Sequence, residues 1–75
     1  LQADIVIANI LAGPLIELAD QLTGLVTPGG WLVLSGLLAN QTREVSEHYV
    51  KNFDFTEEIR GDWALLSGVR HPPIS

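Results

Sequence analysis

The apolar residues of this chain form two short, almost unbroken runs. The first extends from Asp4 to Ala8 and is apolar from Ile5 onward, and the second extends from Trp31 to Ser35. A short run that is apolar on both faces is typical of a parallel strand covered by helices on both sides. The chain is therefore predicted to contain two buried parallel strands.

Apolar residues at helical spacing connect the two runs. The helix is predicted to begin at Pro14, because the missing N–H of proline has no partner to lose at a first helical position. It should end at Thr27-Pro28-Gly29-Gly30, which has turn chemistry. Its single apolar face comprises Leu15, Leu18, Ala19, Leu22, Leu25 and Val26.

The second half of the chain predicts another helix and then a hairpin. The helix should cover Gln41 to Lys51, with Asn40 as its N-cap. Two extended runs follow, Phe55 to Arg60 and Trp63 to Val69, and Gly61-Asp62 lies between them. Two loop residues with glycine first are what a type II′ hairpin turn requires.

The resulting order is strand, helix, strand, helix, antiparallel hairpin. This order predicts an α/β fold in which the two parallel strands are joined by a right-handed crossover. Residues 1–75 are interpreted as a single partial domain, with a loose tail at 71–75 because its two prolines cannot pair in a sheet. Trp31 and Trp63 are expected to be core or rim aromatics, and Glu57-Glu58 a solvated strand end.

Composition limits the class of protein. The chain has 75 residues, contains no methionine and reaches a strand at once, so we expect a piece of a larger protein in preference to a small complete domain. It has no cysteine, which excludes disulfides and thiolate metal sites and is compatible with a cytoplasmic location. His48 and His71 are too far apart in sequence, with no carboxylate at ligand spacing, to predict a metal site.

Charge and hydropathy argue against two kinds of partner. The formal net charge is −5, and the four Lys and Arg residues are scattered, which argues against direct binding of nucleic acid. No apolar run approaches the roughly 20 residues that span a bilayer, so no membrane partner is expected.

The candidate chemistry lies at Asn9, directly after the first strand. In α/β proteins the carboxyl ends of parallel strands face the ligand crevice, and an asparagine there can donate and accept hydrogen bonds without carrying charge. The alternative is that Asn9 caps the following helix. Ser35 and Gly36 end the second strand and should line the same crevice, either as ligand contacts or, as we favour, in a tight turn.

The chain resembles a known family. The element order is similar to the second half of the Rossmann-like, class I S-adenosylmethionine-dependent methyltransferase fold, whose sheet ends in a reversed strand. Residues Val6–Leu15, which read VIANILAGPL, look like the post-strand motif of the PrmA family, the methyltransferases of large-subunit ribosomal protein eleven. Pro28-Gly29-Gly30, Leu34–Leu38 and Trp63–Leu66 extend the resemblance over nearly the whole chain.

The resemblance implies a cytoplasmic enzyme that methylates amino groups of a ribosomal protein, with S-adenosylmethionine as cofactor. In the family the counterpart of Asn9 contacts the cofactor near the acceptor amine, so Asn9 is the candidate for cofactor binding and for positioning the amine. Ile10, Leu11 and Ser35 are the candidate substrate contacts. The aliphatic stretch at residues 10–12 stands where related enzymes carry an aromatic ring for planar targets, which favours an aliphatic amine.

Parts of the family's site are absent from this sequence. The glycine-rich cofactor loop and the ribose-binding acid belong to earlier strands, so the chain alone is expected to be inactive. The strand at Asp4–Ala8 would also lack its neighbour, which predicts self-association through its exposed edge. Two alternatives stay open: another class I methyltransferase with a different amine or small-molecule substrate, and a non-enzymatic α/β interaction module.

Overall fold

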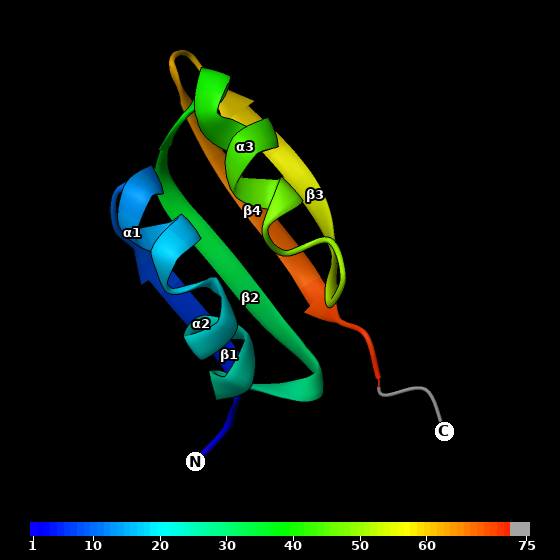
Figure 1. Ribbon diagram of the computed structural model, residues 1–75. Coiled ribbons are helices and arrows are strands. Elements are labelled where there is room, and N and C mark those ends of the chain that lie inside the picture. Colours follow the sequence, from blue (N-terminus) through cyan, green and yellow to red (C-terminus); the bar gives the residue numbers. More distant parts are fainter. Residues whose placement is uncertain (73–75) are drawn as a thin grey trace.

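The computed structural model describes residues 1–72, which fold into a four-stranded mixed sheet (Figure 1). The strands are β1 (Ala3–Asn9), β2 (Val26–Leu38), β3 (Phe53–Arg60) and β4 (Trp63–Arg70), in the spatial order β1-β2-β4-β3. β1 and β2 are parallel, whereas β4 is antiparallel to both β2 and β3. The predicted parallel pair and the hairpin are therefore confirmed, and β4 inserts between the parallel pair and β3.

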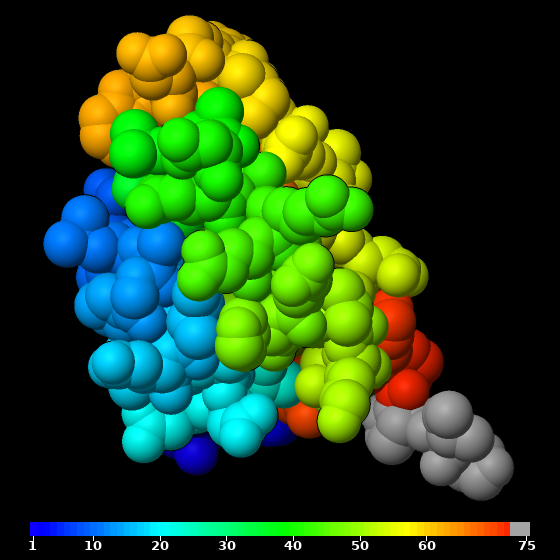
Figure 2. All heavy atoms as spheres, turned by 45° about the horizontal axis from the view of Figure 1, so that its top comes forward, coloured from blue at the N-terminus to red at the C-terminus, as the bar shows by residue number. Residues whose placement is uncertain are grey.

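The described helices cover one face of this sheet. They are α1 (Ala12–Glu17), α2 (Ala19–Leu25), the 3₁₀ helix η1 (Ala39–Gln41) and α3 (Thr42–Glu47), and Figure 2 shows their atoms side by side across that face. Between this layer and the sheet lie the most deeply buried side chains: Leu15, Val26, Leu32, Leu34, Leu37, Val45 and Tyr49.

The opposite face of β1 is uncovered, which contradicts the prediction of helices on both sides. Ile5 is 60% exposed and Ile7 is 69% exposed, whereas Ala8, on the helix side, is buried. Alternate residues of a strand point to opposite faces. The sequence of β1 therefore has the apolar pattern of a doubly covered strand, but residues 1–72 supply cover on one face only.

The predicted first helix is interrupted at Leu18, so the prediction of one continuous helix was wrong. Leu18 has φ −97° and ψ 12°, which separates α1 from α2, although its N–H still donates to the Pro14 carbonyl at 2.9 Å. In α2, Thr23 is buried and Leu25 is 46% exposed, so the buried side of α2 does not follow the predicted apolar face. Val26, assigned to the helical face, instead begins β2. Pro14 is the third residue of α1 and not the first, still within the first turn, where its missing N–H costs nothing.

The predicted turn at residues 27–30 lies inside β2, as a bulge at which the register with β1 shifts. Ala3 pairs with Val26, but Ile5 pairs with Trp31, so four residues of β2 lie opposite Asp4 alone. Gly29 within this bulge has φ +84°, a conformation that glycine adopts without steric cost. The second parallel strand is consequently longer than the predicted Trp31 to Ser35 at both ends.

The second predicted helix is shorter than expected. Helix α3 ends at Glu47, because the chain then turns through Tyr49, whose side chain is buried against the sheet. Asn40 does not cap the helix. The N-cap of α3 is Gln41, which makes no side-chain capping bond to that helix. Its Oε1 atom instead accepts a hydrogen bond of 3.0 Å from the N–H of Leu38, the N-cap of η1.

The hairpin matches its sequence signature. Arg60 pairs with Trp63, Gly61 has φ +61° and Asp62 does not have positive φ, as a type II′ turn requires. At the end of β4, the N–H of His71 donates to the Asn52 carbonyl at 2.6 Å, and its Nε2 lies 2.9 Å from Asp54 Oδ2. The first residue of the predicted loose tail is thus held to the sheet, and residues 73–75 lie outside the described part of the chain.

Candidate functional site

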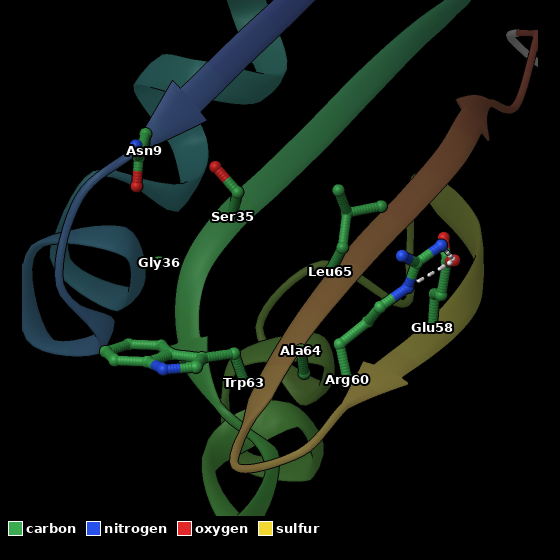
Figure 3. A pocket seen from close by; sticks show the side chains of 8 residues that line it. All are labelled: Asn9, Ser35, Gly36, Glu58, Arg60, Trp63, Ala64 and Leu65. Carbon is green, nitrogen blue, oxygen red and sulfur yellow. Dashed lines mark hydrogen bonds and ion pairs between the residues drawn. The ribbon is translucent and has the colours of Figure 1, made fainter.

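A pocket of about 480 Å³ opens at the carboxyl end of β1 (Figure 3). Its size falls within the range of roughly 300–1,000 Å³ that is usual for small-molecule sites. The strands β1 and β2 form one side, and the hairpin β3–β4 forms the other. The residues that line it are Asn9, Ser35, Gly36, Glu58, Arg60, Trp63, Ala64 and Leu65.

Asn9 lies at the last position of β1 and is exposed to the pocket. It pairs in register with Ser35 of β2, so the parallel ladder brings the two side chains to the same edge of the sheet. The N-cap position of α1 is occupied by Leu11, which makes no side-chain capping bond. Asn9 therefore does not cap this helix.

The carboxamide of Asn9 is free to bind a ligand. Between Leu1 and Pro72, no hydrogen bond joins it to another side chain or to the main chain. Its oxygen can accept and its NH₂ group can donate. The arrangement can bind an uncharged polar group or an amine without placing a formal charge beside it.

Gly36 produces a kink in β2 next to Asn9. The pairing of β2 with β4 shifts between Leu34 and Leu37, and Gly36 has φ +79°. A Cβ atom built on Gly36 would lie 2.5 Å from the Asn9 Oδ1 atom, far inside van der Waals contact. The predicted turn at the end of the second strand is thus present as a kink, and Ser35 beside it also lines the pocket.

The hairpin supplies the opposite wall, which sequence reasoning did not anticipate. The indole of Trp63 is 58% exposed, so it is a rim aromatic, and Figure 3 shows it extending across β2 toward Gly36. On β3, Arg60 Nη2 lies 2.8 Å from Glu58 Oε1, which pairs the two charges at the surface. The antiparallel pairing of Trp63 with Leu38 is what brings this end of the hairpin to the carboxyl end of β2.

Two of the predicted contact residues are placed elsewhere. Ile10 and Leu11 follow Asn9 in the loop before α1, are 37% and 73% exposed, and do not line the pocket of the described chain. The rim indole of Trp63 also changes the argument from residues 10–12. An aromatic surface is present from a different strand, so the aliphatic loop no longer argues against a planar acceptor.

Other classes of site are not found within residues 1–72. No group of three or more His, Cys, Asp or Glu side chains is placed to hold a metal ion. None of the described helices is both long enough and apolar enough to cross a membrane.

Comparison with known proteins assigns the family. Residues 1–71 match the model of the family described as Ribosomal protein L11 methyltransferase (PrmA). The chain belongs to this family. Ribosomal protein L11 methyltransferases from Idiomarina loihiensis and Pseudomonas paraeruginosa are 57% identical over 70 residues and 59% identical over 71 residues, which is 92% of this chain in each case.

A solved L11 methylase has the same fold. The crystal structure of ribosomal protein L11 methylase from Lactobacillus delbrueckii subsp. bulgaricus superposes with a TM-score of 0.84 at 26% identity, over 93% of this chain and 38% of that one. The predicted family and its methyltransferase-like α/β fold are therefore confirmed. The chain spans 24% of the length of the curated L11 methyltransferases it matches, so most of each relative lies outside the region compared.

Proposed function

We propose that this chain forms the carboxyl-terminal half of the catalytic domain of a cytoplasmic protein N-methyltransferase, which transfers methyl groups to amino groups of a large-subunit ribosomal protein. Membership of the L11 methyltransferase family supports the reaction and the substrate class. The observation that carries the site is the Asn9 carboxamide, which lines the pocket with no hydrogen-bond partner in residues 1–72.

A neutral acceptor suits the chemistry of an amine substrate. A lysine amine has a reference pKa of about 10.4, so most of it is protonated near neutral pH and has no lone pair for attack. The Asn9 oxygen can accept an N–H of the amine without the negative charge that would stabilise the ammonium form. Glu58 is the acidic residue of the pocket, and its charge is offset by Arg60 at 2.8 Å.

The described side chains also fit one end of the cofactor. S-adenosylmethionine, when bound, supplies an activated methyl group. The free carboxamide of Asn9 and the hydroxyl of Ser35 have the donors and acceptors to hold its amino-acid end. The glycine-rich loop and ribose-binding acid do not occur in this sequence, so the rest of the enzyme must supply them and the chain alone would be inactive.

Replacing Asn9 in the full-length enzyme tests this role. Asn9→Ala should lower kcat/KM for the acceptor roughly tenfold to hundredfold, since a hydrogen bond to a charged or reacting group contributes about 1.5–3 kcal/mol. Asn9→Asp should lose activity at neutral pH and regain part of it as the pH rises. Its carboxylate raises the pKa of the bound amine, so the neutral amine becomes abundant only at higher pH.

The matched controls are Asn40→Ala and Asn40→Asp, which change an asparagine in η1 outside this pocket and should leave the pH profile unchanged. The measurement is the pH dependence of kcat/KM for methyl transfer to the ribosomal protein. An Asn9→Asp enzyme with the parent profile would exclude Asn9 from amine positioning. Transfer to a free small molecule but not to the protein would support the alternative substrate class, and no transfer by the full-length protein would support an interaction module.

We further propose that the isolated chain self-associates through β1. This strand is an edge of the sheet, carries the exposed Ile5 and Ile7, and has Asp4 as its single charged residue. Antiparallel pairing of two copies centred on Val6 would place each Asp4 opposite Ala8, so the two carboxylates would stay apart.

Sedimentation equilibrium of the isolated chain should show a dimer that dissociates on dilution, and Ile7→Lys should abolish this dimer. A strict monomer with strongly protected amides at residues 5–7 would contradict this expectation.

A further inference from the structure

Gly36 and Asn9 fit together through shape and not through a hydrogen bond. The space that a Cβ atom of residue 36 would occupy is taken by the Asn9 Oδ1 atom, 2.5 Å from the ideal Cβ position, and the Ile10 carbonyl oxygen lies 3.5 Å from it. Real Cβ atoms essentially never approach another heavy atom this closely. Only glycine at residue 36 leaves room for the Asn9 Oδ1 atom at this position.

A second, independent feature also requires glycine at this position. Gly36 has φ +79°, a backbone conformation that residues with a Cβ rarely adopt, and it lies where the register of β2 and β4 shifts. Gly36 directly follows Ser35, which pairs with Asn9, so the kink lies beside the Asn9 side chain. The backbone conformation of β2 at this point and the space for the Asn9 side chain thus both depend on Gly36.

The space beside Gly36 accommodates the Asn9 carboxamide without a hydrogen bond. A side chain usually adopts a defined orientation by making hydrogen bonds, but each such bond would occupy a donor or an acceptor needed for the ligand. Because Gly36 has no Cβ atom, the Asn9 carboxamide can lie beside its main chain with both polar groups available, whereas a Cβ at residue 36 would displace it. Preorganised polar groups are the ones that contribute most to catalysis.

We propose that Gly36 is a positioning residue, which sets the orientation of the Asn9 carboxamide and so acts on methyl transfer through Asn9. This inference rests on the proposed function for its effect on activity. The contact between the two residues stands on the geometry alone and can be tested separately.

The experiment is a double-variant cycle in the full-length methyltransferase: Gly36→Ala, Asn9→Ala and both together. Gly36→Ala should lower kcat for the ribosomal protein roughly tenfold to hundredfold, because small displacements of a catalytic group have effects of this size. In the Asn9→Ala background the same substitution should change kcat less than about threefold, because the group that it displaces is already absent. Effects that multiply in the double variant would overturn the proposal.

Gly29→Ala is the matched control. Gly29 has φ +84°, so alanine there meets the same backbone strain, but a Cβ at Gly29 has no heavy atom within 4 Å. Gly29→Ala should therefore lose stability as Gly36→Ala does and retain the parent kcat. If it loses kcat to the same extent, strain in the strand explains the effect and the positioning role is excluded.

Two outcomes separate this proposal from the proposed function. If Gly36→Ala alone fails to fold, recovery of folding in the double variant supports the steric contact. If both variants stay unfolded, the backbone strain at φ +79° is the cause, and Gly36→Asn, which tolerates positive φ but still carries a Cβ atom, takes the place of Gly36→Ala in the cycle; effects that multiply there overturn the proposal. If Asn9→Ala retains full activity, the proposed role of Asn9 fails. The ¹H–¹⁵N signals of the Asn9 side-chain amide then decide the contact: a shift in Gly36→Ala but not in Gly29→Ala supports it, and unchanged signals in both overturn it.

Discussion

Leu34→Ala is expected to destabilise the fold by about 2–5 kcal/mol, the usual cost of removing a fully buried leucine. Leu34 lies in the middle of β2 and has no solvent exposure. It pairs with Ala8 of β1 on one side and with Leu66 of β4 on the other, and all three side chains are buried beneath the helices. The truncation would therefore open a cavity where the parallel pair meets the hairpin.

The size of this effect matters because the chain is small. A domain of this length has a total stability of roughly 4–11 kcal/mol, so the loss would be a large share of it. Leu11→Ala is the control, since Leu11 is 73% exposed and its truncation should change stability by less than about 0.5 kcal/mol. Urea unfolding curves of both variants and the parent provide the measurement. Equal midpoints for Leu34→Ala and the parent would show that this part of the core is not formed.

Alkaline pH should destabilise the chain through Tyr49. The Tyr49 hydroxyl is buried and donates a hydrogen bond of 2.5 Å to the Leu15 carbonyl, which joins the segment after α3 to α1. Burial raises the pKa of Tyr49 from 10.0 to about 12, because it disfavours the charged phenolate. Folding therefore favours the neutral form.

The direction of the pH dependence follows from this shift. The contribution of Tyr49 to stability is present in full below pH 10, and it is lost as the pH rises from 10 through about 12. Its upper limit is about 3 kcal/mol, since each pKa unit corresponds to about 1.4 kcal/mol. Thermal or urea unfolding measured from pH 8 to pH 12 should show the decline.

Tyr49→Phe separates this contribution from other alkaline effects. The ring stays in place beside Phe53 and Phe55, whose centroids lie 6.2 and 5.8 Å away, but the Leu15 carbonyl loses its side-chain donor. The variant should be about 1–3 kcal/mol less stable at neutral pH and should lose less stability between pH 10 and pH 12 than the parent. An identical alkaline decline in both proteins would show that Tyr49 does not titrate with a raised pKa.

The elements that could be predicted are those specified by local rules. The apolar runs of β1 and β2 and the Gly61-Asp62 turn were recognisable because strand pattern and turn conformation depend on neighbouring residues. The single first helix was wrong, because helical spacing alone did not reveal the interruption at Leu18. The extent of α3 was overestimated for a similar reason: Tyr49 is buried after the helix has ended.

The candidate site also contains some residues that could be predicted from the sequence and others that could not. Asn9 and Ser35 could be nominated because both follow apolar runs, and parallel strands end at the same edge of a sheet. Glu58, Arg60, Trp63 and Leu65 could not be nominated, since they reach the pocket only because β4 inserts antiparallel between β2 and β3. That insertion is a long-range choice of strand partner, which leaves no local signal in the sequence.

By itself, the sequence determined the α/β class, the order of the elements, the resemblance to the PrmA family and the nomination of Asn9. Each of these depends on residue type, short spacing or a contiguous motif. Only the tertiary structure decided that Asn9 does not cap α1, that one face of β1 is uncovered within residues 1–72, and that Gly36 leaves room for the Asn9 carboxamide. The first depends on the residue at which α1 begins. The other two depend on how segments far apart along the chain are arranged, which is fixed only once the strands have paired.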